Sequence, residues 1–360
     1  MKILYAIQGT GNGHIARARD IVPILKEHHE VDVLVSGTQA DIGLPFPVQY
    51  QYKGLCFIFG KSGGIDVFET YKKSNLKILF KDINSLPVEQ YDLVINDFEP
   101  VSAWACFQKN KKCIALSHQD AVLNKNAPRP VKKDVIGKAI LKNYAPATAH
   151  YGFHFKAYSG NVFTPVIRKQ VRELPPENKG HYTVYLPAYD DNRILKILRE
   201  FKGIEWQVFS KHNKKPIEEN NITVRPIDND LFIKSMAAAE GVLCGAGFET
   251  PAEALFLKKK LMVIPMKGQF EQQCNAEALK EMGVPVIKSL KKKHLPKIKE
   301  WLKSGKIIPV DYPDNTEEIL KRVLQEQANA PDPGVIQLGK KIYSLKKFRE
   351  LSFKKIVAQL

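Results

Sequence analysis

The sequence predicts an α/β protein with two open, doubly wound domains that face each other across a cleft. Along most of its 360 residues, short apolar runs alternate with helical patterns, which is typical of parallel sheets with crossover helices. This alternation stops in a proline-rich polar stretch over 158–180 and then restarts, as expected for a linker. We therefore expect an N-terminal domain over 1–163 and a C-terminal domain over 164–334. A basic helix over 335–360 is expected to pack back toward the N-terminal domain.

The composition favours a cytoplasmic protein. No apolar run approaches the roughly 18–20 residues that span a bilayer, and the N-terminus lacks the pattern of a signal peptide. The five cysteines form no C-x-x-C pair and lie in apolar stretches, as reduced cysteines usually do, so we expect no zinc site.

The formal net charge of +17 suggests an anionic partner: nucleic acid, an acidic membrane face or a phosphorylated substrate. Because the lysines are spread along the chain, a merely soluble basic surface explains the charge equally well. The chain shows no arginine-rich tract, zinc finger or aromatic RNA-binding run, so we do not expect it to bind nucleic acid.

The N-terminal domain begins with a strand that leads into a glycine loop. Its expected strands are 2–7, 31–36, 92–96 and 112–116, with a helix over about 13–28. The loop carries Gly9, Gly11, Gly13 and His14. Glycines there let the chain turn sharply and let a ligand approach the backbone. His14, at the carboxyl end of the strand, can take a proton from an attacking hydroxyl near neutral pH, or it can simply cap the helix.

Two acids, Asp97 and Glu99, follow the strand over 92–96 at the same edge of the sheet. Either acid can orient or deprotonate an acceptor, so both are candidate catalytic residues. The alternative is a solvated loop or a helix cap.

In the C-terminal domain the expected strands are 182–186, 205–209, 222–225, 241–244 and 261–264, and the expected helices are 191–201, 230–239, 250–257 and 271–282. The strand over 241–244 ends in a small-residue loop with Gly247. A helix follows, with Thr250 as the expected N-cap and Pro251 at its first position. Glu253 has the spacing of a capping box with Thr250, and it can alternatively face the ribose of a nucleotide.

A second polar helix start follows the strand over 261–264. Glu271 and Gln272 lie at this start and can hydrogen-bond sugar hydroxyls, although acids also favour the first turn of any helix.

These motifs resemble a known enzyme family. Gly-x-x-Thr-x-x-Glu, followed by Pro265 and by Glu-Gln-x-x-Asn-Ala at 271–276, is similar to the donor-binding signature of GT-B glycosyltransferases, which have two Rossmann-like domains. The likeness is greatest to the MurG family of peptidoglycan N-acetylglucosaminyltransferases. The glycine loop with His14, the segment 117–120 and the segment 161–166 resemble further parts of that family.

The resemblance implies a role for each matching residue. Ile227 is expected to place its backbone against the base, Thr250 to contact a phosphate, Glu253 to bind ribose and Gln272 to bind the donor sugar. His14 is expected to act as the base or as a donor contact. The other donor-binding residues implied are Gly11, Gly13, Ala246, Gly247, Phe248, Glu271 and Asn275.

The resemblance also implies the reaction: inverting transfer of a hexose-type sugar from a nucleotide sugar, most simply a UDP-sugar, to an unknown acceptor that is lipid-linked or part of the cell envelope. Backbone N–H groups replace a metal ion in this mechanism, so no metal or other cofactor is expected. The Asp-Asn-Asp segment over 228–230 is interpreted as a helix start. The donor is the only partner expected besides the acceptor; no protein partner is evident.

A basic amphipathic segment over 131–142 is a candidate membrane contact. Val131, Val135, Ile136, Ala139 and Ile140 share one helical face, with lysines around it at 132, 133, 138 and 142. It can rest on an anionic membrane, which would make the protein peripheral on the inner membrane face, or pack in the ordinary way.

Two other functions use the same fold. A UDP-sugar 2-epimerase would act on the donor alone. An inactive nucleotide-sugar or polyanion binder would bind without turnover.

Overall fold

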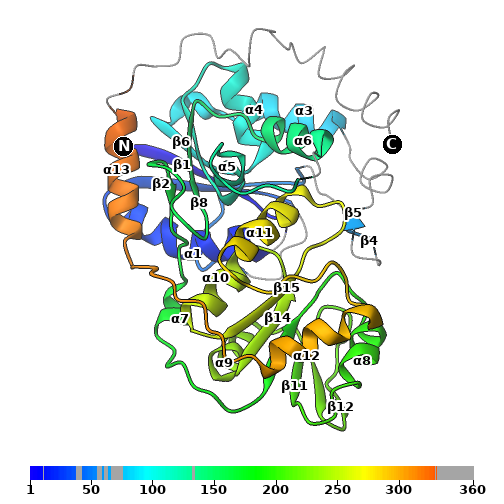
Figure 1. The fold of residues 1–360 in the computed structure, drawn as a ribbon. Coiled ribbons are helices and arrows are strands. Elements are labelled where there is room, and N and C mark those ends of the chain that lie inside the picture. The colour runs from blue at the N-terminus through cyan, green and yellow to red at the C-terminus, as the bar shows by residue number, and fades with distance from the viewer. Residues whose placement is uncertain are drawn as a thin grey trace.

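The computed structural model contains two large β-sheets with helices around them, one above the other in Figure 1. It describes residues 1–10, 12–37, 43–54, 59–60, 64–65, 76–131, 134–328 and 330. Gly11 and the expected helix over 335–360 lie outside these residues. The two sheets confirm the predicted fold class of two doubly wound α/β units. The division at 163 remains a prediction, so the parts around the two sheets are called the first and second halves here.

The first sheet has the strand order β3-β2-β1-β6-β7-β8-β9, and all neighbouring strands are parallel. Its strands are β1 (Lys2–Gln8), β2 (Glu30–Ser36), β3 (Tyr50–Tyr52), β6 (Leu93–Asp97), β7 (Cys113–Leu116), β8 (Ala149–Phe153) and β9 (Val162–Phe163). The chain winds outward in both directions from β1, which lies between β2 and β6. Ligands of open α/β sheets bind at the carboxyl ends of strands where the winding reverses in this way.

The helices of the first half are α1 (Asn12–Lys26), α3 (Leu76–Ser85), α4 (Pro100–Gln108), α5 (His118–Leu123) and α6 (Val135–Tyr144), with a 3-10 turn over Val88–Gln90. A small hairpin pairs β4 (Phe59–Gly60) with β5 (Gly64–Ile65). Helix α1 turns Ile15, Ile21 and Leu25 into the core under the sheet, and each such side chain contributes about 1.5–3 kcal/mol on burial.

Helix α6 differs from the amphipathic helix expected over 131–142. It begins at Val135 after Asp134, which caps it, so Val131 lies before the helix and is 99% exposed. Val135 is also exposed, at 72%, while Leu141 is buried. The side chain that packs into the protein, Leu141, therefore lies outside the predicted apolar face, which ended at Ile140. Residues 132 and 133 and the side chain of Ile136 lie outside the description.

The second sheet has the order β12-β13-β11-β10-β14-β15, and only the edge strand β12 is antiparallel to its neighbour. Its strands are β10 (Tyr182–Tyr185), β11 (Trp206–Ser210), β12 (Ile217–Glu219), β13 (Ile222–Pro226), β14 (Gly241–Gly245) and β15 (Lys260–Ile264). Here β10 is the point where the winding reverses. The five strands expected from sequence are present, each within two residues of its expected bounds.

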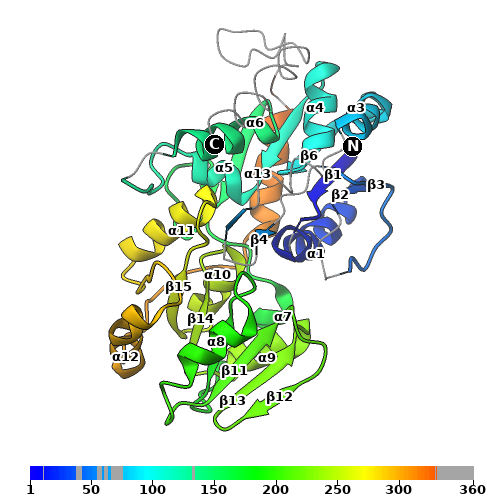
Figure 2. The ribbon, with the colours of Figure 1, turned by 90° about the vertical axis from the view of Figure 1, so that its right-hand side faces the viewer.

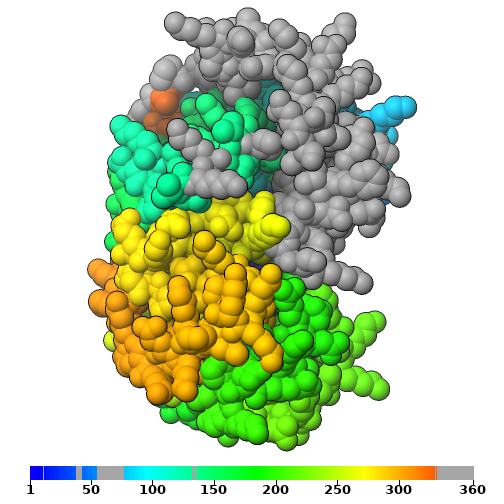
Figure 3. Space-filling view, turned by 45° about the vertical axis from the view of Figure 1, so that its right-hand side comes forward, coloured from blue at the N-terminus to red at the C-terminus, as the bar shows by residue number. Residues whose placement is uncertain are grey.

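Helices pack against this sheet as α8 (Asp191–Leu198), α9 (Asn229–Ala238), α10 (Glu249–Phe256), α11 (Phe270–Glu281) and α12 (Leu295–Lys303), with a 3-10 turn over Lys292–His294. Figure 3 shows the yellow surface of the α11 region directly against the green surface of the first half. The hydrogen bond between Asn275 of α11 and His118 of α5 lies within this contact.

Within the described residues the chain crosses between the halves twice. It leaves the first half after β9 and passes through α7 (Lys169–Arg172), which lies where the halves join in Figure 2. It returns after α12, and α13 (Thr316–Ala328) packs beside α1 and β8 in the first half, where Glu326 accepts a hydrogen bond from Tyr151. Arg172 donates from the first crossing to the carbonyl groups of Tyr312 and Pro313 in the second.

Candidate functional site

His14 and Asp97 meet at the carboxyl edge of the first sheet. His14 lies in the first turn of α1, directly after β1, and Asp97 is the last residue of the neighbouring strand β6. The Nδ1 atom of His14 lies 2.8 Å from Oδ1 of Asp97. The His14 side chain is 12% exposed, and the Asp97 side chain is fully buried.

This contact fixes the tautomer of the histidine. A carboxylate only accepts hydrogen bonds, so Nδ1 of neutral His14 carries the proton and Nε2 carries the lone pair. Nε2 lies 3.4 Å from the amide nitrogen of Gln119, at the start of α5. The ring of Phe98 lies nearly parallel to His14, with centroids 6.5 Å apart, and Phe98 adopts a φ of 57°, which is rare for a bulky residue. The arrangement orients the imidazole and turns its Nε2 away from Asp97.

Arg17 balances the buried charge of Asp97. Its guanidinium is 2% exposed and reaches both carboxylate oxygens, at 2.7 and 2.8 Å from Nη2 and 3.1 Å from Nε. Burial raises the pKa of Asp97, but Arg17 and His14 outweigh this effect and hold the pKa below its usual range. Asp97 is therefore ionised near neutral pH. Sequence reasoning missed Arg17, although its spacing of three residues from His14 on one helix was the available signal.

Glu99 has a structural role, so the geometry does not support the catalytic role expected for it. It is the N-cap of α4, and its carboxylate accepts the backbone N–H groups of Val101 and Ser102 at 2.6 Å each. The residue is fully buried, and burial raises its pKa more than the hydrogen bonds lower it. The helix-cap alternative fits this residue.

The loop from Gly245 to Phe248 is the corresponding feature of the second half. It runs from the last residue of β14 into α10. The first residue of α10, Glu249, binds Arg17 beside the dyad of His14 and Asp97. A Cβ atom added to Gly247 would meet no other atom within 4 Å, and one added to Gly245 would meet its first neighbour only at 3.9 Å. Packing therefore does not require glycine at these positions, and the loop borders open space in which a ligand can approach the backbone. Ala246 is buried, and its carbonyl accepts from Asn275.

The start of α10 differs from the expected cap. Phe248 is the N-cap, without a side-chain cap bond, and the helix begins at Glu249. Thr250 is thus inside the first turn, half-buried. The predicted capping box with Glu253 is wrong, because the helix begins before the threonine. The free N–H groups of this turn lie beside the open glycine loop.

Glu253 is engaged elsewhere. Its two oxygens accept from Nε and Nη2 of Arg168, at 2.5 and 2.8 Å, and it is only 2% exposed. Arg168 also donates to Asn229. A ribose hydroxyl would have to compete with this buried ion pair, so the geometry does not support a free ribose-binding carboxylate.

Helix α11 brings the other predicted residues to the cleft. Glu271 accepts from Gln119 at 3.0 Å, which joins it indirectly to His14. Gln272 accepts from the backbone N–H of Met266 at 2.9 Å and is half-buried. Asn275 is fully buried and accepts from His118 at 2.8 Å. Glu271 and Gln272 are therefore partly buried at this edge, with 17% of the Glu271 side chain exposed, and Asn275 joins the halves.

Two further predicted positions lie at the other end of the cleft edge. Ile227 donates its backbone N–H to the carbonyl of Ser210 at 2.9 Å. Asp228 caps α9 by accepting from Leu231, which agrees with the interpretation of 228–230 as a helix start.

Gly13 packs tightly against the second half: a Cβ atom there would lie 2.4 Å from an oxygen of Glu249. Glu249 is the second site residue that sequence reasoning missed.

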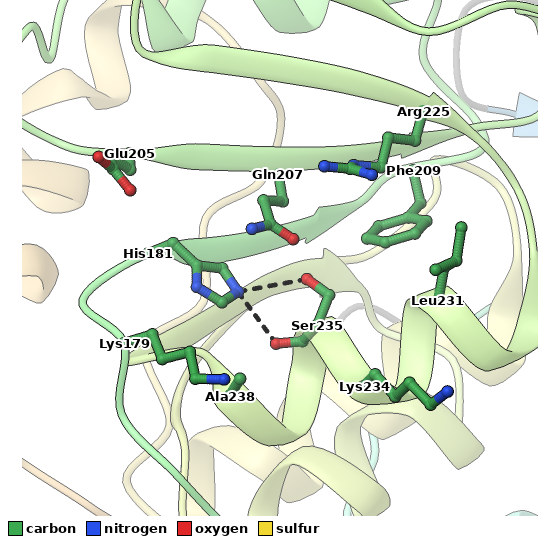
Figure 4. A pocket seen from close by; sticks show the side chains of 10 residues that line it. All are labelled: Lys179, His181, Glu205, Gln207, Phe209, Arg225, Leu231, Lys234, Ser235 and Ala238. Carbon is green, nitrogen blue, oxygen red and sulfur yellow. Dashed lines mark hydrogen bonds between the residues drawn. The ribbon is translucent and has the colours of Figure 1, made fainter.

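A separate cavity of about 350 Å³ lies between α9 and the strands β10, β11 and β13 (Figure 4). His181 and Ser235 line it, and His181 donates from Nε2 to the carbonyl of Ser235. His181 and Glu205 immediately precede β10 and β11, so this end of the cavity is at the amino-terminal edge of the sheet. It lies away from the edge that carries the glycine loop.

Comparison with known proteins gives a family. A family model described as glycosyl transferase family 1 matches residues 1–304. A search of curated proteins found no match. Within the described residues, no helix is long and apolar enough to cross a membrane.

Three solved structures share the fold at low identity. The glycosyltransferase SsfS6 of Streptomyces sp. SF2575, complexed with thymidine diphosphate, is 15% identical, with a TM-score of 0.53 over 92% of this chain and 96% of its own. MurG of Acinetobacter baumannii is 13% identical, with a TM-score of 0.52 over 90% and 99%. The spinosyn rhamnosyltransferase SpnG, complexed with thymidine diphosphate, is 12% identical, with a TM-score of 0.50 over 91% and 96%.

Proposed function

The chain belongs to glycosyl transferase family 1 and is a glycosyltransferase, and from that premise we propose that it transfers a hexose-type sugar from a nucleotide sugar, with inversion and without a metal ion. The observation that carries the proposal is the dyad of His14 and Asp97. It lies at the carboxyl edge of one sheet and faces the open glycine loop of the other half.

His14 is the general base of this proposal. Its Nε2 lone pair takes the proton of the acceptor hydroxyl as the oxygen attacks the anomeric carbon. Asp97 holds the ring by accepting from Nδ1 and stabilises the imidazolium that forms. General base catalysis of this kind contributes on the order of 100- to 10,000-fold in rate.

The donor diphosphate is placed at the start of α10. The N–H groups of the first turn and the backbone of Gly247 supply donors to the leaving phosphates, and the helix dipole favours negative charge there. We assign the sugar hydroxyls to Glu271 and Gln272, and their partial exposure supports this assignment. Two of the solved relatives carry thymidine diphosphate, which supports a nucleoside diphosphate as the leaving group. We favour a UDP-sugar, with dTDP-sugars as the second donor class to test.

The nucleotide is tested by thermal unfolding with UDP, dTDP, GDP, CDP and NAD. A ligand at a hundredfold excess over its Kd stabilises the folded state by about 2.7 kcal/mol. We expect a shift with one pyrimidine diphosphate. Gly247→Val should abolish that shift without loss of folding, because the new side chain occupies open space. Gly305→Val is the matched control, since Gly305 is equally open but lies after α12.

The reaction is then followed by release of the nucleoside diphosphate with and without candidate acceptors. Release that depends on an acceptor supports transfer. Conversion of the donor sugar alone would instead indicate an epimerase, and binding with no turnover that is unaffected by His14→Ala would indicate a binding protein. No shift with any nucleotide would contradict the donor site.

For the acceptor we propose a lipid-linked or cell-envelope molecule at an anionic membrane face. The exposed apolar side chains Val131 and Val135, with the exposed Lys138 and Lys142 nearby on α6, support this proposal. Co-sedimentation with vesicles should rise with their content of anionic lipid, and Val135→Glu should reduce it. Equal binding to neutral vesicles would contradict the membrane proposal.

A further inference from the structure

Arg17 joins charged groups from both halves of the protein. While Nε and Nη2 bind Asp97, Nη1 lies 2.7 Å from Oε1 of Glu249, the first residue of α10 in the second half. The Arg17 side chain is 2% exposed and that of Glu249 is 24% exposed. One guanidinium therefore bridges Asp97 of the dyad and the start of α10.

Glu249 is closely fitted to the first half. Its carboxylate lies against Gly13 in the first turn of α1, so closely that a Cβ atom there would lie 2.4 Å from Oε2. The amino-terminal end of a helix attracts a carboxylate. Arg17 and the amino-terminal end of α1 together bind the Glu249 carboxylate to the first half.

The negative charge of Glu249 is unfavourable for binding a diphosphate at the proposed donor site. A carboxylate in the first turn of α10 repels a diphosphate bound at that turn, unless a cation neutralises it. Arg17 is a cation within hydrogen-bond distance, and it reaches Glu249 only when the halves are together.

We propose that Arg17 is a positioning residue that holds Asp97 against His14 in working geometry only while Glu249 of the second half is docked beside it. This inference rests on the proposed function. Without Glu249, the guanidinium loses one of its two carboxylate anchors and can turn on Asp97. The distance between His14 and Asp97 then varies, and a misplacement of about 1 Å in a catalytic group costs on the order of 100-fold in rate.

Other contacts across the cleft provide a matched control. Lys156 and Glu281 also form an ion pair between the halves, at 3.3 Å, but both side chains are about half exposed. Exposed pairs of this kind contribute little. Glu281→Gln therefore removes a charge of the same sign from the same interface, away from the dyad.

The first measurement is the distance between the halves without ligand. Spin labels at Lys81→Cys in α3 and Lys299→Cys in α12, in a Cys56→Ser background, report it by pulsed electron resonance. The described cysteines are buried and should not react. Glu249→Gln should broaden the distance distribution relative to wild type, whereas Glu281→Gln should not. An unchanged distribution in Glu249→Gln and in Glu249→Ala would overturn the inference.

The second measurement separates binding from turnover. Glu249→Gln should lower kcat by about 10- to 100-fold without weakening the binding of the nucleotide identified above. A loss of nucleotide affinity that parallels the loss of kcat would indicate a merely structural role and overturn the inference. If no nucleotide binds the wild type, the proposed function fails, while the distance measurement still decides whether Glu249 docks the halves.

Discussion

His118 of the first half stacks face to face on Phe248 of the second half, with ring centroids 3.9 Å apart and planes 4° apart. Its Nδ1 lies 2.8 Å from the carbonyl oxygen of Phe153, and its Nε2 lies 2.8 Å from Oδ1 of Asn275. Phe248 is the N-cap of α10. The start of the proposed donor helix is thus packed directly on the other half of the molecule.

Two substitutions separate the parts of this contact. Phe248→Leu should lower the free energy of unfolding by about 1 kcal/mol, because an aromatic pair contributes about 0.5–1.5 kcal/mol beyond area burial. His118→Phe keeps the stack but removes the hydrogen-bond partner of Oδ1 of the buried Asn275, at a cost of about 1–3 kcal/mol. Urea unfolding measures both. A smaller loss for His118→Phe than for Phe248→Leu would show that stacking, not hydrogen bonding, dominates here.

The dyad predicts a loss of turnover without loss of binding. His14→Ala removes the proposed base and should lower kcat by about 100- to 10,000-fold, while nucleotide affinity changes little. His150→Ala is the control, because His150 also pairs with an aspartate, Asp120, but its side chain is 60% exposed. Initial rates at saturating donor and acceptor measure the effect. Equal activity of wild type and His14→Ala would exclude this histidine as the base.

Two buried histidines predict a loss of stability in acid. Burial lowers the pKa of His118 by more than the charge of Glu271 and the hydrogen bonds to Phe153 and Asn275 raise it. Burial also lowers the pKa of His154 well below its usual value, and the two rings lie 5.1 Å apart. Since the unfolded chain then binds more protons, stability is full above about pH 6.5 and falls as the pH drops toward the folded pKa values. Each histidine contributes a slope of about 1.4 kcal/mol per pH unit there.

Thermal unfolding between pH 7.5 and 5 tests this dependence. His154→Phe removes one titrating group and should flatten the slope by about half. The parallel control is His150→Ala, since the hydrogen bond to Asp120 raises the pKa of this histidine by more than burial lowers it. A slope that His154→Phe leaves unchanged would assign the acid sensitivity to other groups.

Metal removal is expected to have no effect on transfer. In the proposed mechanism the N–H groups at the start of α10 stabilise the leaving diphosphate, and Asp228 of the Asp-Asn-Asp segment is occupied as the cap of α9. Initial rates in excess EDTA should equal those in added Mg²⁺ or Mn²⁺. Full loss of activity in EDTA, restored by Mn²⁺, would contradict the metal-free mechanism.

The sequence predicted the strands and loops of the site well because their signals are local. Continuous apolar runs identified β1, β6, β14 and β15, and the glycines after β1 and β14 identified both loops. Strand β8 was missed because Ala149–Phe153 includes His150 and Gly152 and shows no apolar run. The local rule for N-caps favoured Thr250, but the helix begins at Glu249, which pairs across the cleft.

The partners of the site residues could not be predicted in the same way. Arg17 and Glu249 are 232 positions apart in the chain, and Gln119 and Glu271 are 152 apart. No local pattern specifies which polar residues of two halves meet. The role of Glu99 was also difficult to predict. Pro100 after it is typical of a helix start. An acid at the end of a strand, however, has the same sequence pattern whether it caps a helix or takes part in catalysis.

The two crossings joined by Arg172 restrict how the halves can move. A single linker would let one half rotate about any axis. Two neighbouring segments act as a two-stranded hinge, which favours rotation about one axis. Because Arg172 binds the carbonyl groups of Tyr312 and Pro313, the two crossing segments are held side by side. Rotation about the line through both crossings remains easy, and torsion about the long axis is opposed. The two crossings therefore favour a hinge rotation that returns the loop after β14 to the same position against the carboxyl edge of the first sheet.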